Sequence, residues 1–318
     1  MIITTIMALS VLIFFNKYFK VSKLLTFFCY ICVMKTTKLD NDKYYTPIDL
    51  AKKCINKTFE LIGVENISEI IEPSAGNGSF SNQIENCIAY DLVPENDNII
   101  QANFLDLKLV YKRGRLFIGN PPFGVHNKLV VDFYDKCCDC GDYIAFILPI
   151  SCYKNDIRLY KFDLVYSEDL GLEHYTDRDL HCCFNIYKRP SSGQFNLKPD
   201  YTLNEIMIIE HRRKKGDYQT AANKEIKDGY CYAMCNWGDG CLGKVPNFIG
   251  EYAQEVYFYC QDERIKNEMI ALLEFNKVRE YANSISSKRI SVMKLYKYFY
   301  ENIEGLTLKN NIEEVGLW

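Results

Sequence analysis

A short polar and aromatic segment directly after an apolar run limits most strongly the folds open to this chain. The segment is Asn120-Pro121-Pro122-Phe123, and the run before it, Arg115-Leu116-Phe117-Ile118-Gly119, predicts a buried strand. Because α/β folds bind ligands at the carboxyl edge of their sheet, we expect the segment to lie at such an edge. The asparagine offers a side-chain acceptor, the prolines stiffen the turn, and the phenylalanine offers a face on which a base can stack.

A glycine-containing loop precedes this segment by about forty residues. It reads Glu72-Pro73-Ser74-Ala75-Gly76-Asn77-Gly78-Ser79-Phe80 and follows a predicted strand over 69–71. Glycine at 76 and 78 allows the backbone to pass close to a bound molecule, since a side chain there would occupy its space. The third glycine of the dinucleotide fingerprint is missing, so the loop alone is a weak signal.

Strands alternate with helices over the first part of the chain. Thr46 and Pro47 predict a helix start, with a capping hydroxyl and a proline at the first helical position, and Gly63 predicts its end. An apolar stripe from Leu129 to Cys137 predicts a crossover helix. The alternation predicts an α/β fold, a Rossmann-like, doubly wound, mostly parallel sheet. The predicted strands cover residues 69–71, 87–90, 99–102, 116–118, 143–148, 164–166 and 182–187.

The alternation fades after Pro190-Ser191-Ser192-Gly193, which we interpret as a linker. We therefore expect a catalytic domain over residues 34–190 and a smaller C-terminal region over 191–318. The second region contains an apolar stretch at 206–209, a glycine-rich turn at 237–240 with Trp237, a predicted strand at 255–259 and a helical run at 262–275.

Residues 1–33 form an apolar N-terminal segment. Lysines divide it into two halves, each too short to span a membrane as one helix. It lacks the leading positive charge of a signal peptide. Because Met34 stands before a polar stretch, we expect the working protein to begin there and to act in the cytoplasm, nucleoid or nucleus; a membrane anchor is the alternative.

The charge and the cysteines restrict the partners further. With a net charge of -3, any nucleic-acid surface has to be a local basic patch, such as residues 211–215 or 288–297; an ordinary solvated surface is the alternative. The 14 cysteines are scattered and lack the spacing of a zinc finger, so we expect reduced, partly buried thiols and no metal. Cys231, Cys235 and Cys241 are the alternative metal cluster.

These motifs, together with Tyr44-Tyr45-Thr46-Pro47 upstream, resemble the S-adenosylmethionine-dependent adenine-N6 methyltransferases that act on DNA. The resemblance is to the group in which the cofactor motif precedes the catalytic one, and it covers roughly residues 44–190. It implies a class I methyltransferase fold and methyl transfer to N6 of an adenine flipped out of double-stranded DNA. A restriction nuclease is a further partner that the resemblance allows.

The resemblance also assigns roles to residues. The catalytic residues are Asn120, Pro121, Pro122 and Phe123. The cofactor contacts are Tyr45, Thr46, Glu72, Ser74, Gly76, Gly78, Phe80, Asp91, Asp106 and Asn120, with Asp91 facing the ribose and Asp106 the adenine amine. The substrate contacts are Phe123, Phe184, Arg212 and Arg213.

Three other functions remain open at this point. The Asn-Pro-Pro-Phe segment also occurs in enzymes that methylate RNA adenines, and close variants occur in enzymes that methylate protein glutamine. A catalytically silent subunit that holds nucleic acid is the third. The glycine loop combined with Tyr45-Thr46-Pro47 upstream favours DNA.

Overall fold

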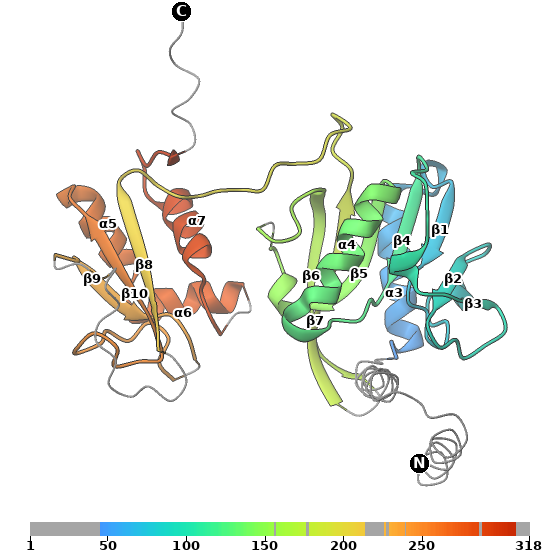
Figure 1. Cartoon of the computed structure of the whole chain (residues 1–318), viewed down its shortest axis with the longest axis horizontal. Coiled ribbons are helices and arrows are strands. Elements are labelled where there is room, and N and C mark those ends of the chain that lie inside the picture. The colour runs from blue at the N-terminus through green and yellow to red at the C-terminus, as the bar shows by residue number, and fades with distance from the viewer. Residues whose placement is uncertain are drawn as a thin grey trace, which may run out of the picture.

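The computed structural model describes residues 45–155, 157–175, 178–213, 226, 229–238, 240–285 and 288–309. The expectations for residues 1–33 and for Met34 lie outside this range. Two sheets form separate parts of the chain, a seven-stranded sheet with the order β3-β2-β1-β4-β5-β7-β6 and a three-stranded sheet with the order β8-β10-β9 (Figure 1).

The seven-stranded sheet is Rossmann-like and mostly parallel. Strands β1 to β5 run parallel, and β7 is inserted antiparallel between β5 and β6. The predicted strands and the mostly parallel sheet are thereby confirmed. The strands are β1 (Glu69–Glu72), β2 (Ile88–Asp91), β3 (Ile99–Gln101), β4 (Arg115–Gly119), β5 (Tyr143–Pro149), β6 (Asp163–Tyr175) and β7 (Arg178–Lys188).

Strands β6 and β7 are longer than the sequence predicted. They pair as an antiparallel hairpin whose pairing with β5 ends at Cys182, so the residues beyond it pair only with each other. The apolar pattern marks only the part of each strand that packs in the sheet. This is why the prediction found 164–166 and 182–187 and missed the extensions.

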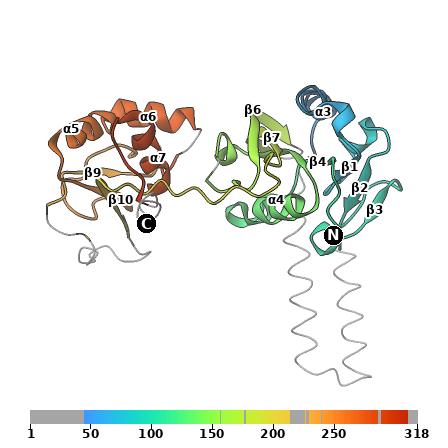
Figure 2. The ribbon, with the colours of Figure 1, turned by 90° about the horizontal axis from the view of Figure 1, so that it is seen from above.

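Two helices cover opposite faces of this sheet, α3 (Ile48–Ile62) and α4 (Lys128–Cys140) (Figure 2). Side chains alternate along β4: Leu116 and Ile118 pack in the core under α3, whereas Phe117 packs in the core under α4. A strand buried on both faces reads as a continuous apolar run, as β4 does. The end of that run therefore fixes where Asn120 leaves the sheet.

The predicted start of α3 is wrong in one respect. Pro47 is the N-cap residue of α3, and the helix begins at Ile48, with no side-chain hydrogen bond at the cap. The hydroxyl of Thr46 accepts a hydrogen bond from Asn120 instead. The end of the helix is confirmed, because Gly63 follows its last residue with a positive φ of 80°, which favours glycine.

A second core forms around the three-stranded sheet. Its strands are β8 (Ile206–Arg212), β9 (Tyr232–Cys235) and β10 (Gln254–Cys260), and its helices are α5 (Glu263–Leu272), α6 (Phe275–Ser284) and α7 (Val292–Asn302). The predicted helical run over 262–275 is divided, since α5 ends at Leu272 and α6 starts at Phe275. Residues 189–205 connect the two parts without a named strand or helix.

Among the described residues, none of the helices combines the length and the apolar character needed to cross a membrane. Over the same range, His, Cys, Asp and Glu side chains do not gather in groups of three or more that could hold a metal ion.

Asn185 joins three segments of the first part. Lying fully buried on β7, it donates from Nδ2 to the Cys152 carbonyl at 2.9 Å and to the Tyr187 hydroxyl at 2.8 Å. Its Oδ1 accepts from Ser167 Oγ at 2.8 Å. Asn185 thus holds the loop after β5 against β6 and β7.

We expect Asn185→Leu to lower the free energy of unfolding by about 2–4 kcal/mol, because it leaves buried polar groups without partners. Urea unfolding followed by circular dichroism measures this. Asn283→Leu, on an exposed position of α6, is the matched control and should change stability by no more than about 0.5 kcal/mol. Equal effects of the two substitutions would contradict the role of Asn185.

Candidate functional site

The segments that carry the motifs meet at the carboxyl ends of β1, β2 and β4. Asn120 Nδ2 donates to Thr46 Oγ1 at 3.2 Å, and Ser74 Oγ donates to the Asn120 carbonyl at 3.3 Å. Ser79 Oγ donates to the Thr46 carbonyl at 2.8 Å. The Tyr45-Thr46 segment, the glycine loop and the Asn-Pro-Pro-Phe segment, although distant in sequence, therefore form one hydrogen-bonded unit.

The glycine loop after β1 turns sharply at both glycines. Gly76 and Gly78 have φ values of 56° and 85°, in the left-handed region that other residues rarely adopt. A Cβ on Gly78 would lie 2.7 Å from Asn82 Nδ2. The positive φ angles therefore disfavour any residue with a side chain at both positions.

Asp91, at the end of β2, holds the glycine loop in place. Its Oδ2 accepts from the Gly76 amide at 2.7 Å, and its Oδ1 accepts from the Val93 amide at 2.8 Å. An ionised carboxylate has about four acceptor positions, so hydroxyl groups of a bound molecule can still donate to Asp91. The predicted ribose contact of Asp91 stays a prediction.

Tyr45 lies against the same loop. Its ring is 3.7 Å from the position that a Cβ on Gly76 would take, and its hydroxyl donates to Glu95. The Glu95 amide donates to the Gly76 carbonyl at 3.2 Å, and Asn96 Nδ2 donates to the Asn77 carbonyl at 3.0 Å. Sequence reasoning missed Glu95 and Asn96; their position shortly after Asp91 was the signal that could have found them.

Glu72 supports the loop from inside the protein. The side chain is 2% exposed, and its Oε2 accepts from the Ser81 amide at 2.8 Å. Burial raises the pKa of this carboxyl to about 7, and the nearby charge of Asp91 acts in the same direction. Glycine at 119 makes room for it, since a Cβ there would lie 3.3 Å from Glu72 Cγ. A contact of Glu72 with the cofactor's amino-acid part stays a prediction.

Asp106 lies at the end of the neighbouring strand β3, in a short helical turn, Phe104–Asp106. It is exposed, and its Oδ2 accepts from Asn103 Nδ2 at 2.7 Å. Phe104 anchors the turn in the core by packing against Phe117 and Phe133. The turn follows β3, which pairs with β2, so Asp106 and Asp91 follow adjacent strands at the same edge of the sheet.

Two aromatic residues predicted for the site have side chains that are buried in the core. Phe80 and Phe184 are both buried in the cluster between the sheet and α3. The alternation of side chains along β7 turns Phe184 toward that face. There its ring packs edge-on against the ring of Tyr166, with the two ring centroids 6.4 Å apart. Phe123, by contrast, is only partly buried and packs against the cores on both faces of the sheet.

The predicted arginines lie in the other part of the chain, at the end of β8. Arg212 is exposed and pairs with Glu210 at 2.7 Å. Arg213 donates to the carbonyls of Gly250 and Glu251 at 2.9 and 2.6 Å. The guanidinium of Arg213 thus fixes a loop and is partly buried, whereas Arg212 is exposed.

No family model matches the sequence, and neither does any curated protein. Several solved structures are similar to part of the chain. One is a Pyrococcus horikoshii protein provisionally described as an RNA methyltransferase, with 14% identity and a TM-score of 0.38 over 46% of this chain and 87% of its own. Another is the 23S rRNA methyltransferase ErmE, with 12% identity and a TM-score of 0.35. The similarity covers 49% of this chain and 73% of ErmE.

A third is a type I restriction-modification methyltransferase subunit from Streptococcus thermophilus. It is 15% identical, with a TM-score of 0.35 over 47% of this chain and 45% of its own. Each of these similarities covers less than half of the present chain.

The buried carboxyl of Glu72 predicts how stability depends on pH. The pKa in the folded protein, about 7, lies above that in the unfolded chain, so the folded state binds the proton more tightly. We expect stability to fall as the pH rises from about 5 to 8, by an amount on the order of 3 kcal/mol. Glu72→Gln should remove this fall, because the amide keeps an acceptor for Ser81 and does not ionise.

Thermal unfolding of both proteins across that pH range measures the effect. A parallel fall of stability in the wild type and in Glu72→Gln would show that another group is responsible.

Proposed function

We propose that this chain transfers a methyl group from S-adenosylmethionine to the N6 amine of adenine in DNA. The observation that carries the proposal is the hydrogen-bonded junction of Asn120 with Thr46 and with Ser74 of the glycine loop. Since Nδ2 of Asn120 donates to Thr46, Oδ1 is the acceptor end of this amide. The amine acceptor thus stands next to the loop suited to a nucleoside cofactor.

The residues around the glycine loop fit S-adenosylmethionine. The left-handed glycines bring the backbone of 76–78 to the edge without side chains, and Asp91 and Asp106 offer carboxylate acceptors at the ends of adjacent strands. In the proposal, Asp91 accepts from the ribose hydroxyls, Asp106 accepts from the cofactor's adenine amine, and Tyr45 lies over the loop. Bound there, the cofactor would supply an electrophilic methyl carbon attached to a sulfonium.

Asn120 and Pro121 act on the incoming amine. The N6 electron pair of adenine is delocalised into the ring, so the nitrogen is a poor nucleophile. Hydrogen bonds from N6 to Asn120 Oδ1 and to the Pro121 carbonyl favour a more tetrahedral nitrogen, the geometry reached in the transition state. With the cofactor bound, the electron pair of N6 would form the new N–C bond, the electron pair of the broken S–C bond would remain on sulfur, and N6 would release one proton to solvent.

The base has to leave the duplex to reach this pocket. Extrusion costs a few kcal/mol, which contacts in the pocket offset. Phe123 is the stacking face in this proposal, because it follows Asn120 directly and is partly accessible. Pro122 stiffens the turn between them. With Phe184 in the core, an opposite stacking face would have to come from another residue.

Asn120→Ala tests the proposed chemistry. We expect the rate of methyl transfer at saturating cofactor to fall by about 10²–10³-fold, because one preorganised acceptor is lost. Single-turnover transfer of a labelled methyl group to DNA measures the rate, and titration calorimetry measures cofactor binding. Asn66 precedes β1 at the opposite edge of the sheet. The substitution Asn66→Ala is therefore the matched control and should keep the wild-type rate. An unchanged rate in Asn120→Ala would contradict the proposed role of Asn120, and if that activity also depends on a partner protein, this chain is not the catalyst.

The substrate class requires a separate comparison. Purified protein is incubated with labelled S-adenosylmethionine and unmethylated duplex DNA, structured RNA or a glutamine-containing protein. We expect label in N6-methyladenine of DNA. Label only in RNA or only in protein would replace the DNA assignment by one of the two alternatives. Sequencing of modified bases in an expression host would give the recognition sequence, and a cognate restriction nuclease would be sought at the same sequence.

A further inference from the structure

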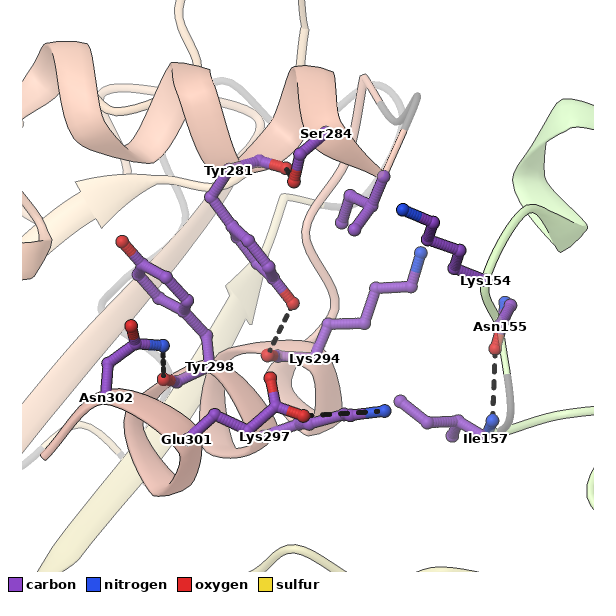
Figure 3. A pocket seen from close by; sticks show the side chains of 11 residues that line it. Lys154, Asn155, Ile157, Tyr281, Ser284, Lys294, Lys297, Tyr298, Glu301 and Asn302 are labelled. Atoms are coloured by element: carbon purple, nitrogen blue, oxygen red, sulfur yellow. Dashed lines mark hydrogen bonds and ion pairs between the residues drawn. The ribbon is translucent and has the colours of Figure 1, made fainter. Parts of the chain in front are cut away.

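A cavity of about 370 Å³ lies between the loop after β5 and the helices α6 and α7 (Figure 3). Lys154 and Asn155 line it from the first part of the chain. Its other lining residues include Lys294, Lys297 and the tyrosines 281 and 298 from the second part. The cavity is thus built by both parts together.

The cavity carries an excess of positive charge. Lys154, Lys294 and Lys297 all line it, whereas Glu301 is its one acidic lining residue and lies 3.8 Å from Lys297 Nζ. In Figure 3, the side chains of Lys154 and Lys294 extend into the same space from opposite sides. The chain as a whole is slightly acidic, so this concentration of lysines is local.

The second part holds its lysines on a rigid frame. Tyr281 of α6 stacks on Tyr298 of α7, with ring centroids 4.1 Å apart and planes 15° from parallel. The Tyr281 hydroxyl donates to the Lys294 carbonyl at 3.1 Å. Lys294 and Lys297, three residues apart, lie on the same face of α7. Such a pair can contact neighbouring negative groups of one polymer.

The first part connects the cavity to the Asn-Pro-Pro-Phe segment. Asn127, four residues after Phe123, donates from Nδ2 to Ser151 Oγ at 2.8 Å. Arg158 donates to the His126 carbonyl at 2.8 Å. The loop that carries Lys154 is therefore bound directly to the loop that follows the segment. A polymer with one unit at Asn120 would have its neighbouring units near this cavity.

We propose that the cavity binds backbone phosphates of the nucleic acid whose base enters the Asn120 pocket. The inference rests on the proposed function and extends it, because it assigns phosphate contacts to Lys154, Lys294 and Lys297. Phosphate is the repeating anion of DNA and of RNA, and lysine is a common partner for it. A protein substrate has no such repeating charge, so the cavity favours a nucleic acid over protein glutamine.

The test uses the full chain and the salt dependence of binding. Fluorescence anisotropy of a labelled DNA duplex, and separately of an RNA hairpin, is measured over a range of salt concentrations for the wild type and for Lys294→Gln/Lys297→Gln. Each lost phosphate contact makes the plot of log K against log salt shallower by about 1, so we expect about 2 for the double substitution. Lys154→Gln, on the other wall, should reduce the slope by about 1.

Lys266→Gln/Lys277→Gln is the matched control, with the same charge change on α5 and α6 and no lining residue of the cavity. Its slope should equal that of the wild type, and circular dichroism should show all variants folded. A change for DNA or for RNA identifies which polymer uses the cavity. The inference would be overturned if the cavity variants and the control variant had the same slope, whether that slope equals the wild-type slope or is reduced by the same amount in both. Because the readout needs no methyl transfer, failure of the proposed activity is a separate result.

Discussion

The hydrogen bond from Asn120 Nδ2 to Thr46 Oγ1 is the interaction on which the organisation of the site depends. It joins residues 74 positions apart in sequence, and Ser74 and Ser79 add bonds from the glycine loop to the same two residues. One amide nitrogen is thereby fixed, which orients the other end of the amide. Thr46 stands one residue before Pro47, the N-cap of α3, and its hydroxyl binds Asn120.

The first sheet was largely predictable because its signals are local. Strands β1 to β5 are short apolar runs between turn residues, and Gly63 marks a helix end by its conformational freedom. The site was predictable to the extent that its residues lie at the ends of such strands, as Asp91 lies at the end of β2. The side of the sheet to which an aromatic residue turns was not, so Phe80 and Phe184 were placed at the site and lie in the core. Long-range contacts such as those of Glu95 and Asn96 leave no periodic pattern in the sequence.

The second part was less predictable for the same reason. A continuous helical pattern over 262–275 conceals the break between α5 and α6, and a basic run at 211–215 does not distinguish the exposed Arg212 from Arg213, whose guanidinium binds loop carbonyls. Lysines that are far apart in sequence, Lys154 and Lys294, line one cavity because the chain brings both parts together there. Charge counted along the sequence is therefore a poor guide to charge gathered in space.

The central claim is that the edge formed by the glycine loop, Asp91 and Asn120 holds S-adenosylmethionine. Titration calorimetry of the purified full chain with this cofactor tests the claim most directly. The account predicts saturable binding at one site per chain, weakened strongly by Gly78→Val, whose side chain would meet Asn82 in a left-handed turn. A folded wild-type protein with no affinity for the cofactor would contradict the account.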